Sequence, residues 1–314
     1  MSYRYVTALA IALTLLTSSS QAGILTDLLT FSGDDVILED NSRGLFYDED
    51  GNGVLSAGDV VAGLMRIDRR VAPTATASMD DRRQLIFAYS LQVETVEQLN
   101  GLGIYTVDFG PTAAATGKDL ASLLGEAHKP AGFTDWDKAA LVVMEQTFAA
   151  DDVANNPVSN TSVAGATLMQ SVLGSASGYT LDIIAGFDSE DDFYQNLLLG
   201  APGISIPAIR AAGGSVTLGT HSGGLSVLYD NLGENILFQP VVATTVLGGA
   251  ASSHDIGIEG GILFGNDEVN WDFADKANFR MNVIEIPEPN SLTLCGLLVG
   301  LFGLAWSGCR RAAR

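Results

Sequence analysis

The residues best suited to chemistry lie in one short stretch near the front of the chain, where oxygen-bearing groups recur at every second position. The candidate ligands are Asp48, Asp50, Asn52, Val54 (through its backbone carbonyl), Ser56 and Asp59. Calcium is a hard cation that takes about six to eight oxygen ligands, such as carboxylates, carbonyls and water. The chain must bend sharply for these ligands to converge, and Gly53 lies at the centre of the stretch, where the absence of a side chain permits the bend. The spacing therefore predicts that residues 48–59 bind one Ca²⁺.

The same stretch resembles the calcium loop of EF-hand and dockerin proteins. Asp stands at loop positions one and three, Asn at five, Gly at six and Ser at nine. Leu55, at position eight, stands where such loops place a short strand residue that faces the core. Position twelve departs from the pattern, since it is Asp59 and not Glu, and the chain has no second loop of this kind. The resemblance implies a structural calcium site with a dissociation constant of about 10⁻⁴–10⁻³ M. The alternative is a glycine-rich surface turn that holds no metal.

Two flanking elements must position this loop. Residues 44–47 favour an extended approach to it, because Gly44 falls where an incoming helix would need an apolar residue. After the loop, Val60, Val61, Leu64 and Ile67 recur at helical spacing, which predicts an exiting helix over about residues 59–68. Small residues over 71–80 then predict a connecting loop to the rest of the chain.

The body, residues 71–285, mixes both periodicities. Alternation predicts strands over 85–96, 104–109 and 180–187, whereas spacing and capping predict helices over 118–128, 134–149 and 189–199. Glycine-rich turns predict two hairpins, one centred on Gly223-Gly224 and one that joins 256–264 to 272–285. The expected class is therefore α+β and β-rich, with a β-sandwich-like body that carries helical insertions.

Composition narrows the possible functions. The 314-residue chain has 16 Lys and Arg against 37 Asp and Glu, a formal charge of −21. Such acidity argues against nucleic acid and anionic lipid surfaces as partners, because both require clustered basic residues. A hydrophobic content of 47% is too high for a disordered acidic chain. The two cysteines, Cys295 and Cys309, lie near the end, which excludes disulfides and thiol chemistry from everything before them.

Other candidate groups favour a structural interpretation. His221 and Ser222 are adjacent, so on a strand they would point to opposite faces, and we expect a turn instead of a nucleophile. His254 and Asp255 predict a solvated loop, and the acids of 188–192 predict a helix cap. No catalytic motif is found, and the protein is expected not to be an enzyme. Paired carboxylates for glycoside hydrolysis depend on separation in space, so that alternative stays open.

The first 22 residues have the order of a secretory signal peptide. Arg4 supplies the positive start, an apolar run covers 6–16, and small residues at Ser20 and Ala22 predict cleavage after Ala22. Export would place the mature protein outside the cytoplasm.

The C-terminal end carries the features of a second targeting signal. Pro287, Glu288 and Pro289 precede an apolar run over 292–306, and Arg310, Arg311 and Arg314 close the chain. This order resembles the PEP-CTERM sorting signal of Gram-negative-type bacteria. The resemblance implies transient membrane insertion of residues 286–314 as a helix, and processing by an exosortase, an integral-membrane protease. Hosts of this class usually make exopolysaccharide, which makes an extracellular polysaccharide a candidate partner.

Together these patterns predict four segments: a signal peptide (1–22), an N-terminal segment with the calcium loop (23–70), a β-rich body (71–285) and a sorting signal (286–314). The expected function is that of an exported cell-surface or extracellular-matrix protein with one structural calcium site. The alternative is a secreted carbohydrate-active hydrolase or lectin-like module.

Overall fold

The computed structural model describes residues 23–29, 33–73, 79, 82–99, 104–150, 156–158, 162–189, 192–199, 216–233, 236–243, 252–264 and 271–286. The signal peptide, and the sorting signal from residue 287 onward, lie outside these residues. The strands are β1 (Val36–Tyr47), β2 (Val60–Ala72), β3 (Arg83–Leu99), β4 (Ile104–Pro111), β5 (Ala139–Thr147), β6 (Thr180–Gly186), β7 (Phe193–Leu199), β8 (Val216–Asp230), β9 (Ile236–Gln239), β10 (Val241–Ala243), β11 (Ser252–His254), β12 (Ile256–Phe264) and β13 (Phe273–Glu285). The helices are α2 (Ile24–Leu28), α3 (Leu120–Leu123) and α4 (Gly165–Leu173), with 3₁₀ turns η1 (Ala114–Thr116) and η2 (Glu126–His128).

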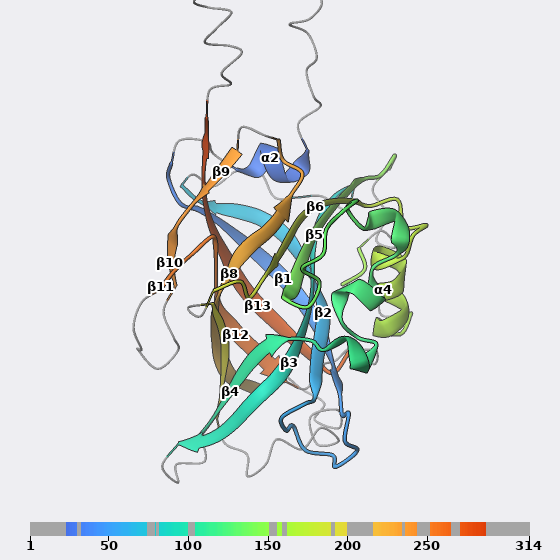
Figure 1. Ribbon diagram of the computed structural model, residues 1–314, viewed down its shortest axis with the longest axis vertical. Helices are drawn as coiled ribbons and strands as arrows, with labels where there is room; N and C mark the ends of the chain where they lie inside the picture. Colours follow the sequence, from blue (N-terminus) through green and yellow to red (C-terminus); the bar gives the residue numbers. More distant parts are fainter. Residues whose placement is uncertain are drawn as a thin grey trace, which may run out of the picture.

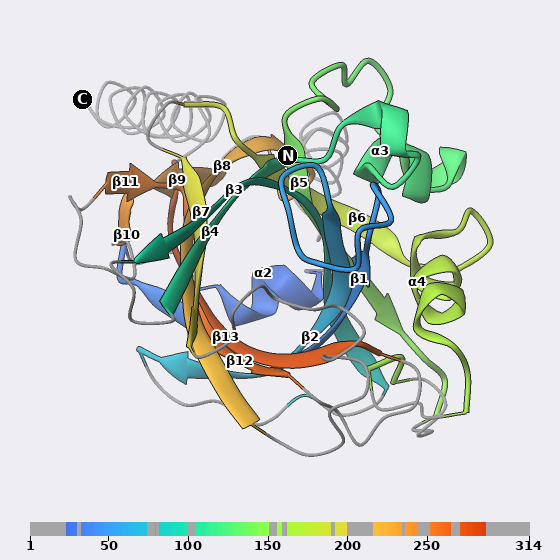
Figure 2. The same cartoon turned by 90° about the horizontal axis from the view of Figure 1, so that it is seen from below.

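Eleven of the described strands form one antiparallel sheet that closes on itself (Figure 1), and β10 and β11 form a separate two-stranded sheet. β1 pairs with β2 and β2 with β3, while on the other side β1 pairs with β13, β13 with β12 and β12 with β8. The two arcs are joined through β4 and β7, and again through β5 and β6. Figure 2 looks along the enclosed interior, with the strands arranged around it. Closure pairs the edges that an open sheet would leave unsatisfied.

Two positions in this closed sheet are shared by a pair of short strands. The first half of β3 pairs with β5 and its second half with β4, so the segment between β4 and β5 is an insertion into one strand position. The edge of β8 is divided in the same way between β7 and β6. The insertion between β4 and β5 carries η1, α3 and η2, and α4 lies between β5 and β6.

The interior of the closed sheet is the larger of two hydrophobic cores. β1 alternates between buried and half-exposed residues along its whole length, and β13 alternates in the same way over most of its length. Inward-facing aromatic residues meet across the core, with the Phe87 and Phe279 ring centroids 4.5 Å apart and those of Phe46 and Phe273 4.9 Å apart. Helix α2 closes one end of the sheet. Its apolar residues are buried in this core: Ile24, Leu25 and Leu28.

The second core lies between the outer face of β2, β3, β5 and β6 and the helical insertions that cover them. Leu64, Ile86 and Val142 point outward from the sheet into this layer, where Leu168 and Val172 of α4 contact it. Strands β2 and β5 are therefore buried on both faces for much of their length.

The β-rich α+β class with helical insertions is confirmed. The expected two-layered sandwich is instead a single sheet whose opposite walls share one core, because β8 pairs with β12 and closes the ring. The two segments that flank the calcium loop belong to this sheet as β1 and β2, and the extended approach over 44–47 is confirmed as the end of β1.

Three predicted helices are wrong. Residues 59–68 enter β2, residues 134–149 contain β5, and residues 189–199 contain β7. In β2 and β5 burial on both faces removes the alternation that marks a half-exposed strand, and the apolar residues then match helical spacing by chance. The helix expected over 118–128 is reduced to the short α3 and η2.

The two hairpin predictions have opposite outcomes. β12 and β13 pair antiparallel as expected, with Phe264 opposite Phe273 at the turn. By contrast, Gly223 and Gly224 lie within the continuous strand β8. A Cβ on Gly223 would lie 2.5 Å from Tyr194 Cδ2, and one on Gly224 would lie 2.1 Å from His254 Cδ2. Because these glycines have no side chain, the neighbouring rings can pack against the strand, and the glycines do not form a turn.

Candidate calcium site in the loop between β1 and β2

The predicted calcium loop connects β1 to β2 at the lower end of the molecule in Figure 1. Gly51 and Gly53 have φ angles of 71° and 75°, so the bend uses the left-handed region that glycine adopts without strain. Leu55 is 3% exposed and packs into the interior core, as its loop position predicts. The loop is therefore a strand–loop–strand unit, in contrast to the helix–loop–helix of an EF-hand.

Strand β3 fixes the end of the loop. The backbone N–H of Gly58 donates to the carbonyl of Val93 over 2.8 Å, and the N–H of Val93 donates to the carbonyl of Asp59 over 2.8 Å. The Gln92 side chain adds a bond from Nε2 to the Gly58 carbonyl at 2.9 Å. The side chain of Asp59 is thereby held in a fixed place against the sheet.

The three predicted carboxylates converge. One oxygen each of Asp48, Asp50 and Asp59 lie within 4.8 Å of one another. Asp59 is 1% exposed, and burial raises the pKa of its carboxyl. The backbone N–H of Asn52 lowers the pKa of the exposed Asp50 carboxyl by a direct hydrogen bond. The cluster thus combines one buried and two more accessible acids.

Backbone donors orient two of these carboxylates. Asp48 accepts from the N–H of Asn52 at 3.1 Å and that of Gly53 at 2.7 Å. Asp59 accepts from the N–H of Glu49 at 2.9 Å and that of Ser56 at 2.8 Å. The loop backbone therefore positions both acids before any cation contributes.

The predicted polar ligands between the acids lie in the same cluster. Asn52 Nδ2 donates to Asp50 Oδ2 at 2.7 Å and to Ser56 Oγ at 3.1 Å. A rotation of the Asn52 amide would exchange this nitrogen for the oxygen Oδ1, which now accepts the Val54 N–H at 2.6 Å. The carbonyl of Val54 as a ligand stays a prediction.

The donor set fits a hard cation. Every side-chain group that the structure brings together here can present oxygen, and the three acids supply the negative charge that Ca²⁺ requires. Glu49 points to a different partner, because its carboxylate lies 2.6 Å from Lys118 Nζ. The geometry can therefore hold one cation through Asp48, Asp50 and Asp59, with Asn52 and Ser56 beside them.

Sequence reasoning missed a polar cluster inside the closed sheet. His221 is buried there, with Nδ1 2.6 Å from Tyr194 Oη and Nε2 2.8 Å from Asp275 Oδ2. Asp40 on β1 accepts the N–H of Ala277, and its Oδ2 is without a hydrogen-bond partner among the described residues. Burial, together with the charge of Asp275, raises the pKa of Asp40 well above its usual value.

The alternation in β1 and β13 was the signal that could have revealed this cluster. Asp40 and Ser42 occupy the same face as Leu38 and Phe46, and Asp275 faces inward opposite Ser42. The expectation of a turn at His221 is wrong, since β8 runs through it.

A second histidine, on β11, also differs from its predicted environment. His254 is buried, with Nδ1 2.9 Å from Asp192 Oδ1, so the expected solvated loop is wrong. Asp192 also accepts from the N–H groups of Asp188 and Ser189, which makes it the cap of a turn before β7 in place of the predicted helix cap.

The sorting-signal residues Pro287, Glu288, Pro289, Arg310, Arg311 and Arg314 lie outside the described residues. Within the part of the chain that the structure describes, no helix has the length and apolar character needed to cross a membrane. Searches with the whole chain found no matching protein-family model, no matching curated protein and no matching solved structure.

Proposed function

We propose that this chain is an exported cell-surface or extracellular-matrix protein whose closed sheet carries one structural calcium site. The observation that supports it is the convergence of Asp48, Asp50 and Asp59 within 4.8 Å in a loop of calcium-binding spacing. The terminal signals supply the route: cleavage after Ala22, and sorting at the inner membrane through residues 286–314. An exosortase-type protease and an extracellular polysaccharide are the proposed partners.

The calcium ion would act on stability and would take no part in chemistry. It would draw the β1–β2 loop together at the point where β3 already holds Gly58 and Asp59. The expected dissociation constant is about 10⁻⁴–10⁻³ M. A free Ca²⁺ concentration about ten times this constant stabilises the native state by about 1.4 kcal/mol. Extracellular calcium in the millimolar range is therefore sufficient for partial to full occupancy.

The test is a calcium titration of the exported protein, followed by calorimetry and by thermal unfolding. We expect binding of one ion and a higher melting temperature at about 10 mM Ca²⁺, well above the expected dissociation constant. The D50N variant should lose most of this response, because it removes the charge of an exposed ligand. Among the described contacts, the Asp50 carboxylate accepts a backbone N–H only from Asn52, so the substitution should disturb the loop backbone little.

The matched control is D137N. Asp137 is an exposed acid in the loop before β5, so this variant removes the same charge far from the cluster in sequence. It should keep the full calcium response. Absence of both binding heat and a thermal shift in the unmodified protein would refute the calcium site.

The hydrolase alternative gains no specific observation from the described residues. A retaining glycosidase needs two carboxyl groups about 5–5.5 Å apart, one on each side of the scissile bond. Outside the loop and the interior cluster, the half-buried Glu145 and the buried Asp182 form a carboxyl pair, and these two are hydrogen-bonded directly to each other. Phe148 is the aromatic residue that lines the hollow beside them.

A further inference from the structure

A pair of carboxyl groups lies beneath helix α2, at the end of the closed sheet opposite the calcium loop. Glu145 comes from β5 and Asp182 from β6, and the two side chains are hydrogen-bonded to each other. Asp182 is 6% exposed, and its Oδ2 is buried without a hydrogen-bond partner among the described residues. Two acids in contact cannot both be ionised at low cost unless a positive charge joins them.

The pKa of Asp182 reflects its burial beside a second carboxyl group. Burial raises it to about 8, and the neighbouring charge of Glu145 adds to the rise. The site as it stands therefore retains a proton at neutral pH. A cation placed beside Glu145 would stabilise the ionised pair, and the pair would then no longer need to retain a proton.

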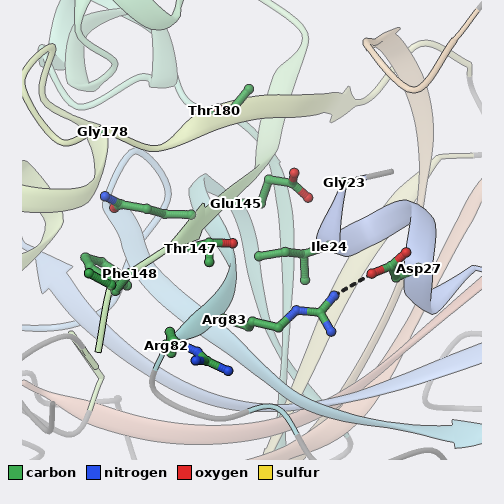
Figure 3. A pocket seen from close by; sticks show the side chains of 12 residues that line it. Gly23, Ile24, Asp27, Arg82, Arg83, Glu145, Thr147, Phe148, Gly178 and Thr180 are labelled. Carbon is green, nitrogen blue, oxygen red and sulfur yellow. Dashed lines mark hydrogen bonds and ion pairs between the residues drawn. The ribbon is translucent and has the colours of Figure 1, made fainter. Parts of the chain in front are cut away.

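The backbone at the start of α2 wraps over the Glu145 carboxylate. The N–H of Leu25 donates to Glu145 Oε2 at 3.0 Å, and a Cβ built on Gly23 would lie 2.6 Å from Oε1 and 2.9 Å from Oε2. Figure 3 shows Gly23 next to this carboxylate. The nitrogen of Gly23 is one bond of about 1.46 Å from the Cα that carries this built Cβ, so it lies in the neighbourhood of the same carboxylate.

We propose that cleavage after Ala22 completes this site, because the new α-ammonium group of Gly23 pairs with Glu145 and becomes the cation that the carboxyl pair lacks. The inference rests on the signal-peptide assignment in the proposed function. Hydrolysis of the Ala22–Gly23 peptide bond by a signal peptidase consumes one water molecule and leaves a carboxylate on Ala22 and an amine on Gly23, which takes up a proton.

The surrounding charges leave this role to the new amino group. The same hollow, about 770 Å³ in volume, is lined by Asp27 of α2 and by Arg82 and Arg83 at the start of β3. Arg83 pairs with Asp27 at 2.7 Å, as the dashed line in Figure 3 shows. From β8, Asp230 lies opposite Ile183, next to Asp182 in β6, and adds no positive charge.

Pairing would also add to the contacts that hold the start of α2, a helix of five residues. Glu145 would offset the ammonium while it still accepts the N–H of Leu25. Because α2 closes the interior core, removal of the signal peptide would strengthen the closure of the sheet at this end.

The test uses the exported full-chain product, with its N-terminus read by mass spectrometry and its α-amine titrated with an acylating reagent. In the unmodified protein, pairing should raise the pKa of the Gly23 amine and slow its acylation near pH 7. A rise of one pKa unit slows the reaction about tenfold. The E145Q variant keeps an acceptor for Leu25 but removes the charge, so it should restore fast acylation and shift the pH profile downward.

Two further variants keep the test decisive. D182N leaves Glu145 in place and should retain slow acylation, and E126Q, at an exposed acid of η2, should match the unmodified protein. An N-terminus at Gly23 with equal rates in the unmodified protein and E145Q overturns the pairing alone. An N-terminus at another residue overturns the assigned cleavage site, and the pairing with it, whereas a calcium response in the same sample still tests the loop separately.

Discussion

Asp40 makes the stability of this protein depend on pH in a direction opposite to that of most surface acids. Its carboxyl lies inside the closed sheet, where burial, followed by the charge of Asp275, raises its pKa well above 3.8. Asp275 already faces His221 Nε2 at 2.8 Å, so we assign the retained proton to Asp40. The native state then binds one proton more than the unfolded chain over the pH range between the two pKa values of Asp40.

The sign of the effect follows from this difference. The contribution of Asp40 is fully present below pH 3.8 and is lost as the pH rises toward its raised folded pKa. One extra bound proton makes the free energy of unfolding fall by about 1.4 kcal/mol per pH unit within this range. The D40N variant removes the titration but keeps a side-chain oxygen that can accept the N–H of Ala277.

Urea unfolding of both proteins at a series of pH values rising from 3.8 measures this difference. The slope of stability against pH should be less negative in D40N by about 1.4 kcal/mol per pH unit, and D40N should be the more stable protein at the upper end. The D137N variant, at an exposed acid, should follow the unmodified protein. Equal slopes in D40N and the unmodified protein would refute the assignment of the proton to Asp40.

Two other substitutions test the packing of the same closed sheet. H221A leaves Asp275 and Tyr194 Oη without their shared partner inside the core, so we expect a loss of about 3–5 kcal/mol in urea unfolding, and a loss below about 1 kcal/mol would contradict the buried network. G224A places a Cβ 2.1 Å from His254 Cδ2 and should cost about 1–3 kcal/mol, whereas G257A, whose nearest neighbour is Val241 Cγ2 at 3.4 Å, should leave the melting temperature almost unchanged. Equal melting temperatures for the two glycine variants would show that His254 does not require the space.

The convergence of the three loop aspartates could be predicted because all of the information for it is local. Asp48, Asp50 and Asp59 are close in sequence, and a sharp bend at Gly53 is enough to bring them together. The same holds for the alternation of β13, which has one face toward the core and the other toward solvent over most of its length. In each case the physical constraint acts within one segment, so the sequence of that segment is enough to show it.

The errors arise where a distant segment decides the structure. β2 lies between the interior core and the layer under α4, so Leu64 and Met65 are buried on opposite faces and the strand loses its alternation. Gly223 and Gly224 suggest a turn when they are read alone, yet the rings of Tyr194 and His254 explain them. The contact between His221 and Asp275 depends on β8 and β13 both pairing with β12, which no local pattern reports.

Acidic residues therefore occur in three distinct environments in the closed sheet and its loops. At one end, three aspartates converge where a cation can neutralise them. In the middle of the interior, a proton on Asp40 and the contact of Asp275 with His221 limit the charge. At the α2 end, Glu145 pairs with Asp182 and lies beside Gly23, the residue that we propose becomes the N-terminus. On the proposed calcium site and the proposed N-terminal pairing, two of these three settings are completed only outside the cytoplasm, so the chain would reach its full stability after export and not before it.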